Sequence, residues 1–126
     1  MSQKTVLLVE DEDNIALALG HLIGRAGYAL RRVASGSDAL PALAEARPDL
    51  VVLDVMLPGR SGYEICQMIR RDASLAGIKV LMITAGGGEM ERRKGMAVGA
   101  DAFMTKPFST AELTRQVRAL LGESDD

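Results

Sequence analysis

The chain has 126 residues, 48% of them hydrophobic, which is enough for one domain with a sizeable core. Its formal net charge is -2 and its 15 basic residues are spread along the chain, so direct nucleic-acid binding is disfavoured. A single cysteine, Cys66, excludes an internal disulfide, and no apolar run approaches the roughly 18 residues of a membrane span. We therefore expect one cytoplasmic domain without a signal peptide and without membrane contact.

Apolar runs alternate with amphipathic segments, which predicts a parallel sheet built from βαβ units. The first strand is expected at residues 6–9. A helix follows it, capped at its start by Asp13 and ended by Gly27. Residues 28–34 are expected to form a second, weaker strand that lies nearer an edge of the sheet.

The second helix is expected to run to about residue 47, with Ser35 or Ser37 as its cap. Because Pro41 removes a helical hydrogen bond, we expect this helix to start late, near Ser37, or to bend. The later strands are expected at three further apolar runs: residues 51–53, 78–83 and 101–105. Three later helices are expected. The first follows a turn at residues 58–62 and runs to about residue 71, the second covers about 89–98, and the last is capped by Ser109 and reaches residue 121.

Polar side chains stand where four of these strands end. They are Glu10 and Asp11 after the first strand, Asp54 after the third, Thr84 after the fourth and Lys106 after the fifth. The carboxyl ends of parallel strands share one edge of the sheet, where open α/β sheets hold their ligands. Three acids, one hydroxyl and one ammonium are therefore expected in a single crevice.

The three acids point to a divalent cation. Close carboxylates repel one another unless a cation lies among them, and Mg²⁺ binds through a few carboxylates and water. The alternative for Glu10 and Asp11 is that they only cap the first helix. The alternative for Asp54 is an ordinary turn residue at a strand end.

Lys106 is suited to a phosphate oxygen or to Asp54 itself, because its ammonium is a compact point charge. Pro107 follows it, so this peptide bond is a candidate for the cis form. Thr84 offers a hydroxyl donor at the same edge. The alternatives are a solvated surface lysine and an ordinary β-branched strand residue.

Four stretches together resemble the receiver domain of response regulators in two-component signalling. They are residues 8–12, 53–59, 83–85 and 99–108, and the likeness extends over about 4–121. The resemblance implies a flavodoxin-like, doubly wound α/β fold. Its five parallel strands would lie in the order 2-1-3-4-5, with helices on both faces of the sheet.

The same resemblance implies a phosphoryl acceptor. Asp54 would accept the group from the phosphohistidine of a sensor histidine kinase or of a histidine phosphotransfer protein. Mg²⁺ or Mn²⁺ would be bound by Glu10, Asp11, Asp54 and the backbone carbonyl of Met56. The chain would catalyse only its own phosphoryl transfer and dephosphorylation, and would not be an enzyme acting on other substrates.

Three further roles come from the resemblance. Thr84 would contact the phosphoryl oxygens, and Lys106 would pair with the phosphoaspartate. Phe103 is similar to the aromatic switch residue that moves inward when the threonine engages, and its alternative role is plain packing.

The output surface implied is the face of the fourth helix, fifth strand and fifth helix, which would contact a downstream protein or a second copy of the chain after phosphorylation. Four residues resemble ion-pairing members of the dimer interface in winged-helix regulators: Lys94, Asp101, Glu112 and Arg118. Three others stand where charged members are expected: Ala97, Ala102 and Gln116. The match to that dimer is therefore incomplete.

Two rival functions remain. A phosphatase of the haloacid dehalogenase type needs a second acid two residues after its nucleophile, where this chain has Met56. A receiver-like scaffold that is never phosphorylated would be indicated by loss of Asp54, Lys106 or the acid pair, and all are present.

We expect a single receiver domain over residues 1–126, with a core over about 4–121 and a frayed tail at 122–126. The start at Met1 and the short acidic tail favour a stand-alone receiver over a fragment of a larger regulator or hybrid kinase.

Overall fold

The computed structural model describes residues 3–85 and 88–122, in which strands and helices alternate strictly. The strands are β1 Thr5–Val9, β2 Ala29–Val33, β3 Leu50–Asp54, β4 Lys79–Thr84 and β5 Ala102–Thr105. The helices are α1 Asp13–Arg25, α2 Gly36–Glu45, α3 Gly62–Arg71, α4 Glu89–Ala97 and α5 Thr110–Leu120. In the part of the chain that is described, no helix is long and apolar enough to cross a membrane.

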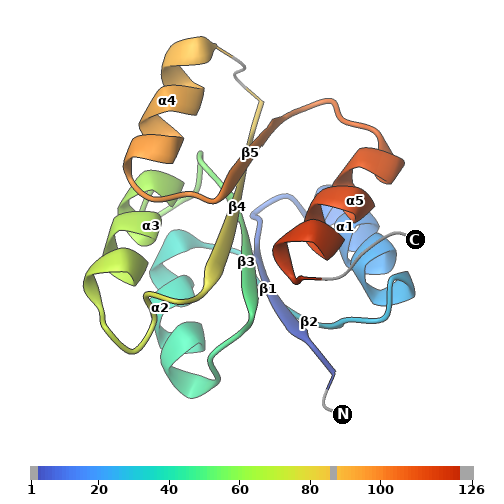
Figure 1. Cartoon of the computed structure of the whole chain (residues 1–126), viewed down its shortest axis with the longest axis horizontal. Helices are drawn as coiled ribbons and strands as arrows, with labels where there is room; N and C mark the ends of the chain where they lie inside the picture. The colour runs from blue at the N-terminus through green and yellow to red at the C-terminus, as the bar shows by residue number, and fades with distance from the viewer. Residues whose placement is uncertain (1–2, 86–87, 123–126) are drawn as a thin grey trace.

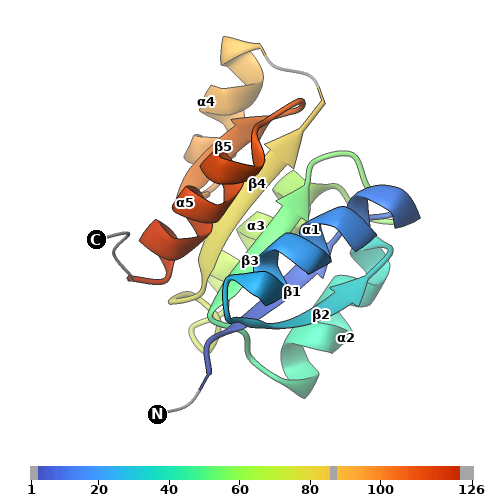
Figure 2. The same cartoon turned by 90° about the vertical axis from the view of Figure 1, so that its right-hand side faces the viewer.

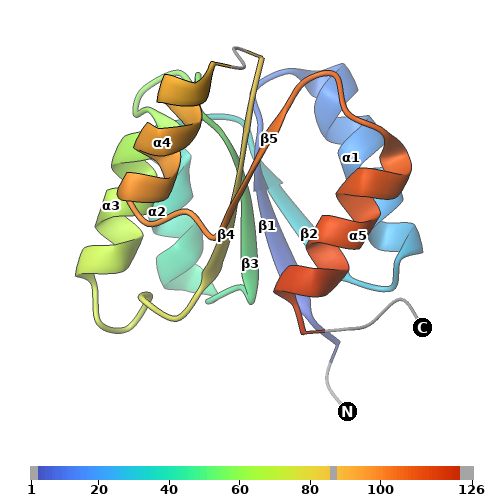
Figure 3. The same ribbon diagram turned by 45° about the horizontal axis from the view of Figure 1, so that its top comes forward.

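The strands form one parallel sheet in the order β2-β1-β3-β4-β5, which confirms the predicted doubly wound fold (Figure 2). Asp54 at the end of β3 is in register with Ile83, and Thr84 at the end of β4 is in register with Thr105. All the strands therefore finish at the same edge, which is the upper edge in Figure 3.

Helices cover both faces of the sheet (Figure 1). Helices α1 and α5 pack on one face, against buried strand residues such as Leu8 and Val52. Helices α2, α3 and α4 lie on the other face, where the core includes Leu7 and Val51. Successive strand residues point to opposite faces, so a strand covered on both sides is apolar at consecutive positions.

The predicted capping of α1 by Asp13 is wrong. Asp13 is the first helical residue, and the cap position is Glu12, which makes no side-chain capping bond. The Asp13 carboxylate instead forms an ion pair with Arg32 of β2, with a separation of 3.0 Å between Oδ1 and Nη1. The partner of this carboxylate is therefore an arginine that is distant in sequence.

Helix α2 begins at Gly36, one residue before the predicted start, and continues through Pro41. The Ser35 side chain caps it by accepting a hydrogen bond from the amide of Asp38. A β-carbon on Gly36 would collide with the carbonyl group of Arg60, so glycine is required where the helix starts.

Two of the later helices, α3 and α5, also have side-chain caps. Ser109 caps α5, as predicted, and Ser61 caps α3 in a capping box with Glu64. The predicted frayed tail falls almost wholly on residues 123–126, which lie outside the described residues.

Candidate functional site

Glu10, Asp11 and Asp54 meet at the carboxyl edge of the sheet. One carboxylate oxygen from each lies within 4.8 Å of the others. Glu10 follows β1 and Asp54 ends β3, and these two strands are neighbours in the sheet. Glu10 is 2% exposed and Asp54 is 8% exposed, whereas Asp11 is exposed to solvent. The three acids thus form a cluster with two buried members and one member open to solvent.

The side chain of Lys106 enters this cluster from the end of β5. Its Nζ donates a hydrogen bond to Asp54 Oδ2 at 2.9 Å and another to Glu10 Oε1 at 3.4 Å. The backbone amide of Lys106 donates to the carbonyl of Thr84 at 2.8 Å, and the Lys106–Pro107 peptide bond is cis. Lys106 therefore bridges both buried acids. The sequence predicted a contact with a phosphate oxygen or with Asp54, and did not predict the contact with Glu10.

Backbone amides bind the remaining oxygens of the two buried acids. The amide of Glu12 donates to Glu10 Oε2 at 3.0 Å, and the amide of Met56 donates to Asp54 Oδ1 at 3.1 Å. Each buried carboxylate thus has one oxygen bound by the main chain and one bound by Lys106. These hydrogen bonds restrict the orientation of both buried carboxylates.

Burial raises the pKa of Glu10, and this effect outweighs the hydrogen bond from Glu12 and the nearby Lys106 ammonium. Burial alone would lower the pKa of Lys106, but its hydrogen bond to Asp54 and the charges of Asp54 and Glu10 raise it. The ammonium is therefore held in its charged form by the two acids that it contacts.

This donor set fits a hard divalent cation. The cluster contains three carboxylates, and two of them contact the Lys106 ammonium, so these four side chains carry an excess of negative charge. Carboxylate oxygens together with water are the ligands that Mg²⁺ prefers. Asp11, which is exposed, leaves the cluster accessible from solvent.

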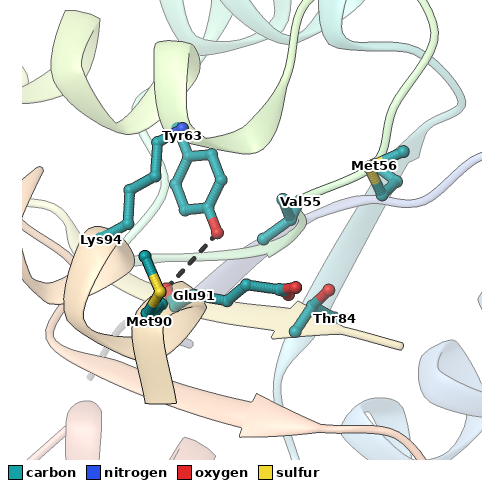
Figure 4. A pocket seen from close by; sticks show the side chains of 7 residues that line it. All are labelled: Val55, Met56, Tyr63, Thr84, Met90, Glu91 and Lys94. Carbon is teal, nitrogen blue, oxygen red and sulfur yellow. Dashed lines mark hydrogen bonds between the residues drawn. The ribbon is translucent and has the colours of Figure 1, made fainter. Parts of the chain in front are cut away.

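A pocket of about 550 Å³ opens beside the acid cluster, between the β3–α3 turn and α4 (Figure 4). Its lining residues are Val55, Met56, Tyr63, Thr84, Met90, Glu91 and Lys94. The hydroxyl of Tyr63 donates to the carbonyl of Glu91 at 3.4 Å, and Lys94 Nζ lies 4.5 Å from the centre of the Tyr63 ring. These contacts join α3 to α4.

Thr84 and Phe103 lie outside the acid cluster. Thr84 is buried at the end of β4 and lines the pocket next to Val55 and Met56. Phe103 is half-buried in the middle of β5, where its ring packs on Gly95 of α4. Sequence reasoning missed both the pocket and this contact, since neither follows from a local pattern.

Comparison with known proteins places the chain in one family. The model of the response regulator receiver domain matches residues 6–118. The transcriptional regulatory protein GltR of Pseudomonas aeruginosa is 40% identical over 118 residues, which are 94% of this chain and 49% of the relative. The alkaline phosphatase synthesis transcriptional regulatory protein PhoP of Bacillus subtilis is 38% identical over 122 residues, covering 97% and 50%. The chain spans about half the length of these curated relatives.

Solved structures agree. The signal receiver domain of a signal transduction histidine kinase from Syntrophus aciditrophicus superposes with a TM-score of 0.88 at 32% identity, covering 94% of this chain and 90% of that one. The BeF3-activated DrrB receiver domain superposes with a TM-score of 0.87 at 32% identity, covering 97% and 100%. The relatives are regulators, so the phosphatase interpretation loses its support. The chain therefore belongs to the response regulator receiver domain family of two-component signal transduction.

Proposed function

We propose that this chain accepts a phosphoryl group on Asp54 from the phosphohistidine of a sensor histidine kinase or of a histidine phosphotransfer protein. The observation that carries the proposal is the 2.9 Å contact between Lys106 Nζ and Asp54 Oδ2, inside a cluster of three carboxylates. A carboxylate oxygen of Asp54 attacks the phosphorus atom, an O–P bond forms, the N–P bond breaks and the released imidazole takes up a proton.

Glu10, Asp11, Asp54 and the backbone carbonyl of Met56 would hold Mg²⁺ or Mn²⁺. The metal would supply neutralisation of the negative charge on the transferring group. Three carboxylates whose oxygens lie within 4.8 Å of one another support this assignment. Lys106 remains beside Asp54 and stabilises the charge that the phosphoryl oxygens bring.

Thr84 and Phe103 form the proposed switch. The phosphoryl group adds a charge of about -1.5 to -2 and three acceptor oxygens next to the end of β4. The Thr84 hydroxyl donates to one of these oxygens, and the Phe103 ring then turns inward. Two observations support this proposal: Thr84 lines the pocket beside Val55 and Met56, and the Phe103 ring is half-buried against α4.

The proposed output is a changed contact between the face of α4, β5 and α5 and a downstream protein. A phosphorylation-dependent homodimer through the same face is the alternative. Asp101, one of its candidate ion-pairing residues, already accepts hydrogen bonds from Arg70 Nη2 at 2.7 Å and from the amide of Val80 at 2.8 Å. Lys94, another candidate, lies over the Tyr63 ring. These contacts within the chain favour a different protein as partner.

We treat the chain as a single receiver domain with no direct contact to nucleic acid or membrane. The relatives are named as transcriptional regulators, but this chain matches only about half of each of them. Their gene-regulatory activity therefore concerns those whole proteins.

Intact-mass measurement after incubation with Mg²⁺ and acetyl phosphate tests the proposal. We expect a gain of one phosphoryl group that is lost when a chelator removes the metal. We expect no gain in the Asp54→Ala variant, whose fold should be intact. If the wild-type chain gains no phosphoryl group from acetyl phosphate or from a phosphorylated histidine protein, the scaffold interpretation replaces the proposal.

A further inference from the structure

Arg32 on the edge strand β2 holds the turn that carries the acid pair. Its Nε and Nη2 both donate to the backbone carbonyl of Glu10, at 3.0 and 2.8 Å. Its Nη1 pairs with Asp13 Oδ1 at 3.0 Å. One guanidinium therefore binds both ends of the β1–α1 turn, and Asp11 lies between the two points of attachment.

The bonds to Glu10 restrict the Asp11 main chain directly. The Glu10 carbonyl belongs to the planar peptide group that joins Glu10 to Asp11. Holding this oxygen therefore restricts the orientation of that peptide plane, which includes the amide nitrogen and Cα of Asp11. The amide of Glu10 also donates to the carbonyl of Val33 on β2, at 3.1 Å. The Arg32 side chain is 29% exposed, so these charge-assisted bonds are partly protected from water.

The charge of Arg32 acts in the opposite direction. A guanidinium next to a cluster that gathers cations raises the local positive potential, which weakens the binding of a metal ion. Its geometric effect and its electrostatic effect on metal affinity therefore have opposite signs. Removing Arg32 loosens metal binding if position dominates, and tightens it if charge dominates.

We expect the geometric effect of Arg32 on metal affinity to be larger than its electrostatic effect. The positive charge is shared with solvent and is screened by salt. The three bonds instead restrict the main chain of the one acid in the cluster that is exposed and least held by packing. Residues that orient metal ligands without touching the ion typically alter metal affinity by about 10- to 100-fold.

We propose that Arg32 is a positioning residue for the divalent metal site, acting through the Glu10–Asp11 peptide and Asp13. This inference rests on the proposed metal-dependent function and adds to it a residue from a strand that carries none of the ligands.

Arg31 provides a matched control on the same strand. Adjacent strand residues point to opposite faces, and Arg31 donates to the carbonyls of Ala42 and Ala46 at the end of α2. Replacing Arg31 with methionine removes the same charge from the same strand without touching the β1–α1 turn.

The test is Mn²⁺ binding by the unphosphorylated chain, followed by electron paramagnetic resonance of the free ion. We expect Arg32→Met to bind Mn²⁺ about 10-fold more weakly than wild type, and Arg31→Met to bind it as wild type does. Arg32→Lys keeps the charge but offers one ammonium to two acceptors, so any weakening in it is geometric. We expect this variant to lie between wild type and Arg32→Met.

Equal or tighter Mn²⁺ binding in Arg32→Met would overturn the proposal, and tighter binding would show that charge dominates. If Arg32→Met does not fold, as judged by circular dichroism, Arg32→Lys decides, and wild-type affinity in it overturns the proposal. If the wild-type chain binds no Mn²⁺, both the metal site and the positioning role of Arg32 are wrong. If the wild-type chain binds Mn²⁺ and the Arg32 variants bind it equally well, only the positioning role is wrong.

Discussion

The ring of Phe103 on β5 lies directly against the backbone of Gly95 in α4. A β-carbon on Gly95 would be 2.9 Å from Cδ2 of this ring and 3.2 Å from Sδ of Met82. The absence of a side chain at Gly95 is therefore what allows Phe103 to pack under α4. The proposed switch residue and the proposed output helix share this contact.

Replacing Gly95 with alanine should destabilise the fold. Alanine is the better helix former by about 1 kcal/mol, but crowding in a packed site costs about 1–3 kcal/mol. We expect a net loss of about 1 kcal/mol in the free energy of unfolding, measured with urea. Gly24→Ala in α1 is the control, because nothing lies within 4 Å of its added carbon, and it should gain about 0.5–1 kcal/mol.

A double-mutant cycle tests the cause of that loss. In a Phe103→Ala background the obstructing ring is gone and only the 3.2 Å contact with Met82 Sδ remains of those named above, so Gly95→Ala should cost less stability than it does in the wild-type chain. If Gly95→Ala costs the same stability with and without the ring, the contact with Phe103 is not the reason.

Lys106→Met should weaken the fold, because it leaves two buried acids without the ammonium that they share. Breaking a buried ion pair costs about 3–5 kcal/mol, and the partial exposure of Lys106 reduces the expected loss to about 2 kcal/mol. Urea unfolding at neutral pH measures this loss. Lys79→Met at the exposed start of β4 is the control and should change little.

The Lys106 contribution should also depend on pH in a defined direction. Its pKa is raised in the folded state above the ordinary value of 10.5, so the stabilisation is complete below that pH and lost as pH rises through the folded value. The difference in free energy of unfolding between wild type and Lys106→Met should therefore be the same from neutral pH to about pH 10.5 and shrink as the pH rises further. A difference that disappears between pH 6 and 9 would contradict the assignment.

Mg²⁺ should stabilise the folded chain through the acid cluster. At ten times its dissociation constant, a ligand that binds only the folded state adds about 1.4 kcal/mol to the free energy of unfolding. Thermal unfolding with and without Mg²⁺ measures this gain. Asp11→Asn should remove most of it without disturbing the core, since Asp11 is exposed. An equal response to Mg²⁺ in both proteins would mean that the ion binds elsewhere.

Cys66 should be unreactive in the native state. Its side chain is fully buried, and burial raises the pKa of the thiol, so little reactive thiolate is present at neutral pH. A disulfide-exchange reagent should modify no thiol in the folded chain and one thiol per chain in denaturant. Rapid labelling of the folded chain would show that α3 opens easily around this residue.

The fold could be predicted because its signals are local. Consecutive apolar residues such as Val51 to Leu53 identify strands buried on both faces, and a serine before a helix, such as Ser109, identifies its start. The polar residues that follow the apolar strands then predict which side chains lie together at the carboxyl edge of the sheet. Strand order came from resemblance to a family, since periodicity alone does not determine it.

The details of the site could not be predicted, because they depend on side chains that are distant in sequence. Glu10 and Asp11 are adjacent acids, yet one is buried and the other exposed. Lys106 contacts Glu10, which is 96 residues away in the sequence, and Arg32 of β2 pairs with Asp13 at the start of α1. The spacing of residues in the sequence does not predict which carboxylate the Lys106 ammonium or the Arg32 guanidinium will contact.

The identity of the phosphorylated residue tests the central claim most directly. The chain is phosphorylated with acetyl phosphate and Mg²⁺, the acyl phosphate is reduced with borohydride, and the modified peptide is sequenced by mass spectrometry. An aspartyl phosphate is converted to homoserine by this treatment, so we predict homoserine in place of Asp54 and unmodified Glu10 and Asp11. Homoserine at another aspartate, or phosphate retained on a serine or threonine, would contradict the account.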